Sequence, residues 1–72
     1  MVNDVAIVQL TLRAANHRQQ ALRTRRLAEQ INDALAHHQL LQYATELERQ
    51  ADDFEVEAAV LKELKEEDAR AA

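Results

Sequence analysis

Residues 40–65 read LLQYATELERQADDFEVEAAVLKELK, and two rows of residues repeat through them at seven-residue intervals. The large row is Leu40, Leu47, Phe54 and Leu61, and the small row is Ala44, Ala51 and Ala58, ending at Lys65. Steps between the rows alternate four and three residues, which is the spacing of a helix that packs along a partner helix. A small row beside a large row favours close antiparallel pairing, because Ala lets two backbones approach each other. The sequence therefore predicts a helix–helix seam made of Leu40, Ala44, Leu47, Ala51, Phe54, Ala58 and Leu61.

A weaker row of the same kind runs through the first half of the chain. Its members are Ile7, Leu10, Ala14, His17, Ala21, Thr24, Ala28, Ile31, Leu35 and His38. Ala again occupies every seventh position between residues 14 and 28, as it does in the second half. We therefore interpret the two halves as partners for each other.

The composition predicts that almost the whole chain is helical. The 72 residues contain no Gly, Pro or Cys, and Ser is also missing. Gly and Pro are the strongest helix breakers, whereas Ala, Leu, Glu, Gln and Arg, which dominate here, are strong helix formers. We expect an all-α chain that forms one small domain over residues 1–72.

The expected architecture is an antiparallel hairpin of two long helices. We predict the first helix at about residues 4–36, a turn near residues 36–39 and the second helix at about residues 40–69. His37 and His38 favour this turn, because a His near a helix C-terminus suits the helix dipole. One uninterrupted helix is an alternative, and so is a short strand at residues 8–13 followed by two helices, because apolar and polar residues alternate there.

Opposite charges in the two halves support antiparallel pairing. Residues 1–38 carry five Arg against three acidic residues, whereas residues 39–72 carry four basic residues against ten acidic ones. Folding back near residue 38 brings the Arg13–Arg26 segment beside the acidic segment of residues 50–63. Exposed pairs of this kind are worth about 0.2–1 kcal/mol each, so they select register and orientation more than they stabilise.

Both ends of the chain carry more apolar surface than a two-helix contact needs. A chain of this length is marginally stable alone, and no disulfide can help because Cys is absent. We expect a homo-oligomer, a dimer that forms a four-helix bundle, or a complex with another helical protein. The candidate oligomer or partner surface is Val5, Val8, Leu12, Val56, Val60 and Leu64.

The segment from Arg13 to Arg26 is the only basic cluster, and no acidic residue interrupts it. Arg side chains on one helix face can bind phosphates, so a nucleic-acid-binding regulator is the alternative function. Its candidate phosphate-binding residues are Arg18, Arg23, Arg25 and Arg26. The overall net charge of −4 and the neighbouring acidic segment favour instead an ion-paired helix face.

Catalysis and metal binding find little support in this sequence. The adjacent His37 and His38 point about 100° apart on a helix and have no ligand four residues further on. No Ser or Cys nucleophile and no Gly-rich loop is present. We predict no cofactor, no metal site and no enzymatic activity.

We expect instead a small regulator, adaptor or assembly factor that acts through protein–protein contacts. No signal sequence or membrane-spanning run is recognised, so a cytoplasmic protein without membrane contact is expected. A subunit or fragment of a larger assembly, poorly ordered when alone, is a further alternative.

Overall fold

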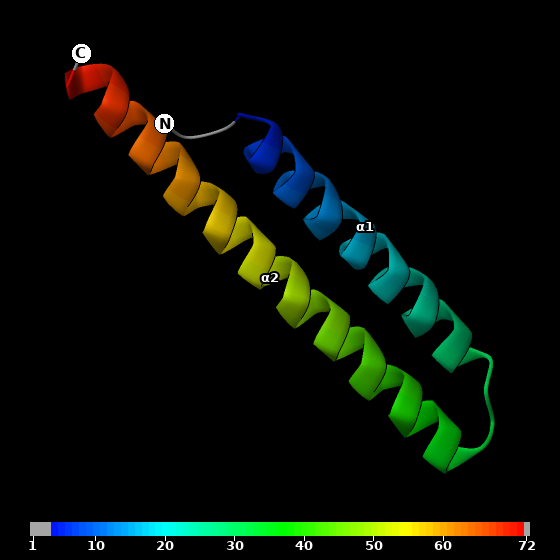
Figure 1. The fold of residues 1–72 in the computed structure, drawn as a ribbon. Helices are drawn as coiled ribbons and strands as arrows, with labels where there is room; N and C mark the ends of the chain where they lie inside the picture. Colours follow the sequence, from blue (N-terminus) through cyan, green and yellow to red (C-terminus); the bar gives the residue numbers. More distant parts are fainter. Residues whose placement is uncertain (1–3, 72) are drawn as a thin grey trace.

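The computed structural model describes residues 4–71 as two helices packed side by side (Figure 1). Helix α1 covers Asp4–Glu29 and helix α2 covers Ala34–Ala71. The two helices run antiparallel, and the molecule extends over 59 × 14 × 11 Å. The prediction of an all-α helical hairpin is confirmed, and the two alternatives, one continuous helix and a strand at residues 8–13, are wrong for this structure.

Local interactions support each helix along its exposed surface. On α2, Arg49 binds Glu46 one turn before it and Asp53 one turn after it, both at 2.6 Å. Ion pairs at these spacings connect neighbouring turns of a helix. The hydroxyls of Thr11, Thr24 and Thr45 each donate to the carbonyl four residues earlier, and the Thr45 hydroxyl also accepts a hydrogen bond from Arg25 of α1 at 3.4 Å.

The turn lies at residues 30–33, before the predicted position at residues 36–39. The amides of Gln30 and Ile31 donate to the carbonyls of Leu27 and Ala28, which closes the last turn of α1. Asp33 then caps α2, because its Oδ1 accepts hydrogen bonds from the amides of Leu35 (2.9 Å) and Ala36 (3.3 Å). The predicted first helix is therefore too long by seven residues, and the second begins six residues earlier than predicted.

A small core runs between the helices and is dominated by Ala. Every buried side chain among residues 4–71 belongs to one of the two repeating rows of its helix. These residues are Ile7, Leu10, Ala14, Ala21 and Ala28 of α1, and Ala44, Leu47, Ala51 and Ala58 of α2. Six of the nine are Ala, so the backbones lie close together and each contact removes little apolar surface from water.

Candidate interaction surface

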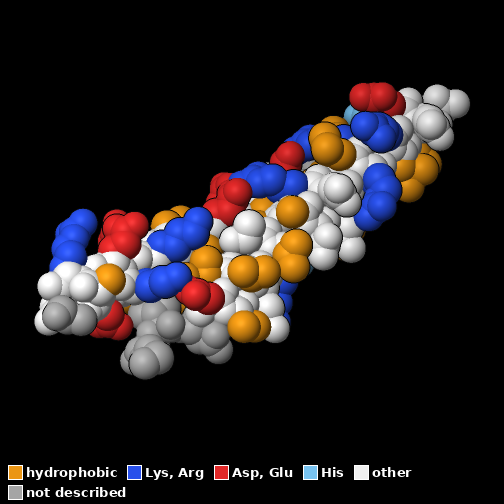
Figure 2. Space-filling view, turned by 90° about the horizontal axis from the view of Figure 1, so that it is seen from above, with side chains coloured by type: hydrophobic (Ala, Val, Ile, Leu, Met, Phe, Trp, Pro, Cys, Tyr) orange, Lys and Arg blue, Asp and Glu red, His pale blue; other side chains and the backbone are white. Residues whose placement is uncertain are grey.

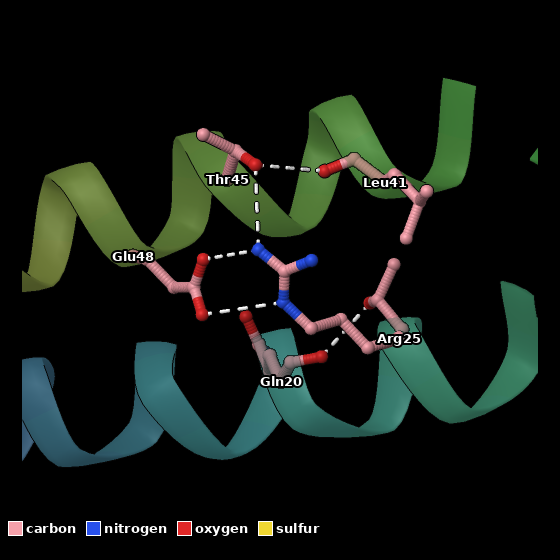
Figure 3. Close-up of polar contacts among 6 residues, drawn as sticks. Gln20, Arg25, Leu41, Thr45 and Glu48 are labelled. Carbon is pink, nitrogen blue, oxygen red and sulfur yellow. Dashed lines mark hydrogen bonds and ion pairs between the residues drawn. The ribbon is translucent and has the colours of Figure 1, made fainter. Parts of the chain in front are cut away.

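Among residues 4–71, four ion pairs join the two helices: one links Lys65 of α2 to Asp4 of α1 at 2.5 Å, and the other three lie on one side of the hairpin. Arg18 of α1 binds Asp52 of α2 at 2.7 Å and also contacts Glu55. Arg25 donates to both carboxylate oxygens of Glu48, through Nη2 at 2.5 Å and Nε at 3.3 Å (Figure 3). We call this the ion-pair side.

These contacts change the acidity of the groups that make them. Hydrogen bonds from Arg25 lower the pKa of the Glu48 carboxyl below its ordinary value, and the same bonds raise the pKa of Arg25. Hydrogen bonds to Glu55 and Asp52 raise the pKa of Arg18. Arg18 and Arg25 thus each connect α1 to a carboxylate of α2.

The seven predicted seam residues face α1, but they are buried to different extents. Ala44, Leu47, Ala51 and Ala58 are buried. Leu40, Phe54 and Leu61 are only half-buried. Phe54 contacts the ring of His17 edge to face, with ring centroids 5.2 Å apart. The small row is thus fully covered by the hairpin, whereas most of the large row is not.

The helical register places the two rows on different sides of the seam. The paired residues Arg18 and Arg25 lie four residues after Ala14 and Ala21, so the Ala rows of both helices are adjacent to the ion-pair side. The large rows are therefore adjacent to the opposite side. On that side the register places Leu27 of α1 and Tyr43, Val60 and Leu64 of α2, all exposed. We call this the tyrosine side.

The six predicted surface residues are all exposed, with between 44% and 64% of each residue accessible. They are Val5, Val8, Leu12, Val56, Val60 and Leu64. They do not form one continuous patch: Val5, Val8 and Leu12 lie on the outer face of α1, Val56 lies on the outer face of α2, and Val60 and Leu64 belong to the tyrosine side. Figure 2 shows hydrophobic side chains reaching the surface in separate groups, with charged side chains between them.

The four Arg residues predicted to bind phosphate fall into two pairs. Arg18 and Arg25 hold carboxylates on α2, as described above. Arg23 and Arg26 make no ion pair with any described residue, and they line a shallow hollow on α1 together with Gln19 and Leu22. The structure therefore does not bring all four together on one open basic surface.

Leu27 and Tyr43 were missed as surface candidates. Each immediately precedes an Ala of the small row, and each belongs to a seven-residue series that runs beside the seam. That series is Ala6, Arg13, Gln20 and Leu27 in α1, and Ala36, Tyr43, Gln50, Glu57 and Leu64 in α2. The middle positions of the series are polar, so the series does not show an apolar seven-residue repeat, although residues at its ends are apolar.

Among the described residues there is no group of three or more His, Asp or Glu side chains placed to hold a metal ion. No helix within residues 4–71 is long and apolar enough to cross a membrane. Known protein-family models, curated protein sequences and solved structures yield no match to this chain. The function must therefore be inferred from the geometry of the hairpin.

Proposed function

We propose that this chain is a small non-enzymatic module for protein–protein interaction, a regulator, adaptor or assembly factor. The observation that carries the proposal is the contrast between core and surface. Ala forms most of the core, whereas ten large apolar residues of the described chain are exposed. Apolar side chains that flank a helical seam are the groups by which one helix packs in the groove of another, so these residues favour a helical partner.

The energetics of folding support self-association. Ordering a chain costs about 1.5 kcal/mol per residue, and burial of apolar area must offset this cost. A core in which six of nine buried residues are Ala supplies little area, and no disulfide is present. A second hairpin would add the missing burial, so we propose a homodimer in the form of a four-helix bundle.

The state of the interhelical carboxylates bears on the non-enzymatic part of the proposal. Acid–base catalysis by carboxylates requires groups that converge in a desolvated cleft. Here Asp52 is exposed, Glu48 is half-buried, and both are bonded to Arg side chains. We keep the cytoplasmic location as a prediction from the sequence.

Solution mass by size-exclusion chromatography with light scattering tests the proposal. We expect a mass of twice 8.2 kDa, together with a single cooperative helical unfolding transition by circular dichroism. A monomer that captures no partner protein in crosslinking would overturn the proposal. The outcome for a subunit of a larger assembly is different: weak, non-cooperative helicity in isolation.

Absorbance at 260 and 280 nm on the same sample tests the nucleic-acid alternative. Tyr43 is the only Tyr and the chain contains no Trp, so bound nucleic acid would dominate the spectrum. Arg23 and Arg26 are the residues to exchange for Gln, because they make no ion pair with a described carboxylate. A 260 nm excess that nuclease removes and that R23Q/R26Q abolishes would favour this alternative.

A further inference from the structure

We infer that a second copy of this chain binds on the tyrosine side, related to the first by a two-fold axis parallel to the helices. The inference deepens the proposed function and rests on it, because it names the partner and the surface. The surface consists of Leu27, Tyr43, Val60 and Leu64, bordered by Arg13, Arg23 and Glu57.

Incomplete burial of the large row indicates that this side is the one to be covered. Leu40, Phe54 and Leu61 belong to the large row of α2, Ile31 of the turn continues the seven-residue series of Leu10, His17 and Thr24, and all four are half-buried. The Ala rows next to the ion-pair side are already buried. A second layer of helices on the tyrosine side would remove the remaining apolar area from water, which a layer on the ion-pair side would not do.

The ion-pair side is also the less favourable one to bury. A second hairpin there would remove from water the contacts of Arg18 and Arg25 with their carboxylates. Desolvation of charged groups costs several kcal/mol per ion and is offset only by very good geometry. On the tyrosine side, no interhelical ion pair among residues 4–71 would be desolvated.

Charge selects the orientation of the second copy. An axis perpendicular to the helices would place α2 on α2, whose sequence carries many more acidic than basic residues. An axis parallel to the helices instead places α1 of each copy on α2 of the other, so that an Arg-bearing helix meets an acidic one. We therefore choose the parallel axis.

The register of the hairpin then predicts the contacts. Within one copy, the ring contact of His17 with Phe54 fixes which residues lie at the same height. Leu27 lies ten residues after His17, and Tyr43 lies eleven residues before Phe54. Because the helices are antiparallel, Leu27 and Tyr43 lie at the same position along the long axis of the hairpin. A two-fold axis along the helices keeps heights equal, so Leu27 meets Tyr43 of the second copy.

The same comparison of positions along the long axis predicts a charged contact between the two copies. Arg13 lies four residues before His17 and Glu57 lies three residues after Phe54. Neither makes an ion pair with another residue in 4–71. In the dimer, Arg13 meets Glu57 of the second copy, and the symmetry forms this pair twice.

A pair of matched variants tests which side is used. Leu27 and Leu22 are exposed to nearly the same extent, 49% and 53%, but Leu22 lies on the outer face of α1. We expect L27E to weaken the dimer at least about tenfold in sedimentation equilibrium, because it places a carboxylate in both of the symmetry-related apolar contacts with Tyr43. We expect L22E to leave the mass unchanged, because Leu22 shares its helical position with Val8 on the outer face of α1 and does not lie on the tyrosine side. Circular dichroism of both variants shows whether the helices persist.

The outcomes separate this inference from the proposed function. If L22E dissociates the dimer and L27E does not, the assignment to the tyrosine side is wrong. If the wild-type chain stays monomeric up to millimolar concentration, self-association on this side is wrong, but a module that binds a different helical protein still stands.

A charge exchange tests the orientation and does not depend on the stability of L27E. R13E and E57R should each weaken self-association, because each variant places like charges opposite each other. An equimolar mixture of R13E and E57R should restore the dimer mass, since the new carboxylate of one variant then faces the new guanidinium of the other. A mixture that stays monomeric would overturn the parallel two-fold axis.

Discussion

Ala51 is fully buried where the two helices approach each other, and it has no room for a larger side chain. We expect Ala51→Leu to force the helices apart and to lower the free energy of unfolding by about 1–3 kcal/mol through overpacking. Ala59→Leu is the matched control, because Ala59 is exposed on the same helix. Urea unfolding followed by circular dichroism measures both variants, and an unchanged midpoint for Ala51→Leu would reject close packing of the Ala row.

The carboxylate of Glu48 links stability to pH. Hydrogen bonds from Arg25 lower the pKa of Glu48 below its ordinary value of 4.5. A carboxyl with a lowered pKa in the folded state stabilises the protein above its unfolded pKa, and the stabilisation is lost as pH falls through the lower folded value. Below both values, protonated Glu48 contributes nothing through this pair.

We therefore expect Glu48→Gln to lower the melting temperature by about 1–4 °C at pH 7 and to have a smaller effect near pH 2. Thermal unfolding of wild type and variant at both pH values provides the measurement. Glu63→Gln is the control, because Glu63 makes no ion pair with another described residue. Equal effects of Glu48→Gln at both pH values would show that the Arg25 pair does not cause the difference.

At the scale of the elements, the turn is where sequence and structure disagree. The large row of the first half continues through Ile31, which lies in the turn and is half-buried. Apolar periodicity therefore extends past the end of α1, and no Gly or Pro interrupts it. The end is set instead by the Asp33 cap and by His37, whose Nδ1 donates to the Ala28 carbonyl at 2.7 Å. Contacts between the ends of two helices are not visible in the periodicity of one.

The Asp33 cap supplies the prediction at this scale. Asp33→Ala removes the acceptor for the Leu35 and Ala36 amides and should cost about 0.5–2 kcal/mol of unfolding free energy. Asp33→Asn keeps a capping oxygen and should cost much less. Chemical unfolding of the two variants decides the matter: equal losses would mean that the charge of Asp33 matters rather than its hydrogen bonds.

For the whole molecule, the sequence was sufficient for the architecture and insufficient for the surface. Ala at every seventh position in both halves predicts two closely packed antiparallel helices, because a row of small residues lets two helix backbones approach each other. The sides of the hairpin depend on the register between the helices, which interhelical contacts such as Arg25–Glu48 and His17–Phe54 reveal. The residues of the predicted apolar surface therefore lie on different faces of the hairpin, which the sequence alone does not reveal.

Self-association, if it supplies the burial that the Ala core lacks, makes stability depend on concentration. The unfolding enthalpy is about 0.7 kcal/mol per residue, so for a dimer of 72-residue chains a tenfold rise in concentration should raise the melting temperature by about 5 °C. Circular dichroism melts over roughly two decades of protein concentration measure this shift. L27E should show a much smaller shift over the same range, since its dimer is weakened, while L22E should follow the wild type. A wild-type melting temperature that does not change with concentration would mean that the hairpin is stable as a monomer. Its exposed apolar residues would then be the binding surface for a different protein and not for a second copy.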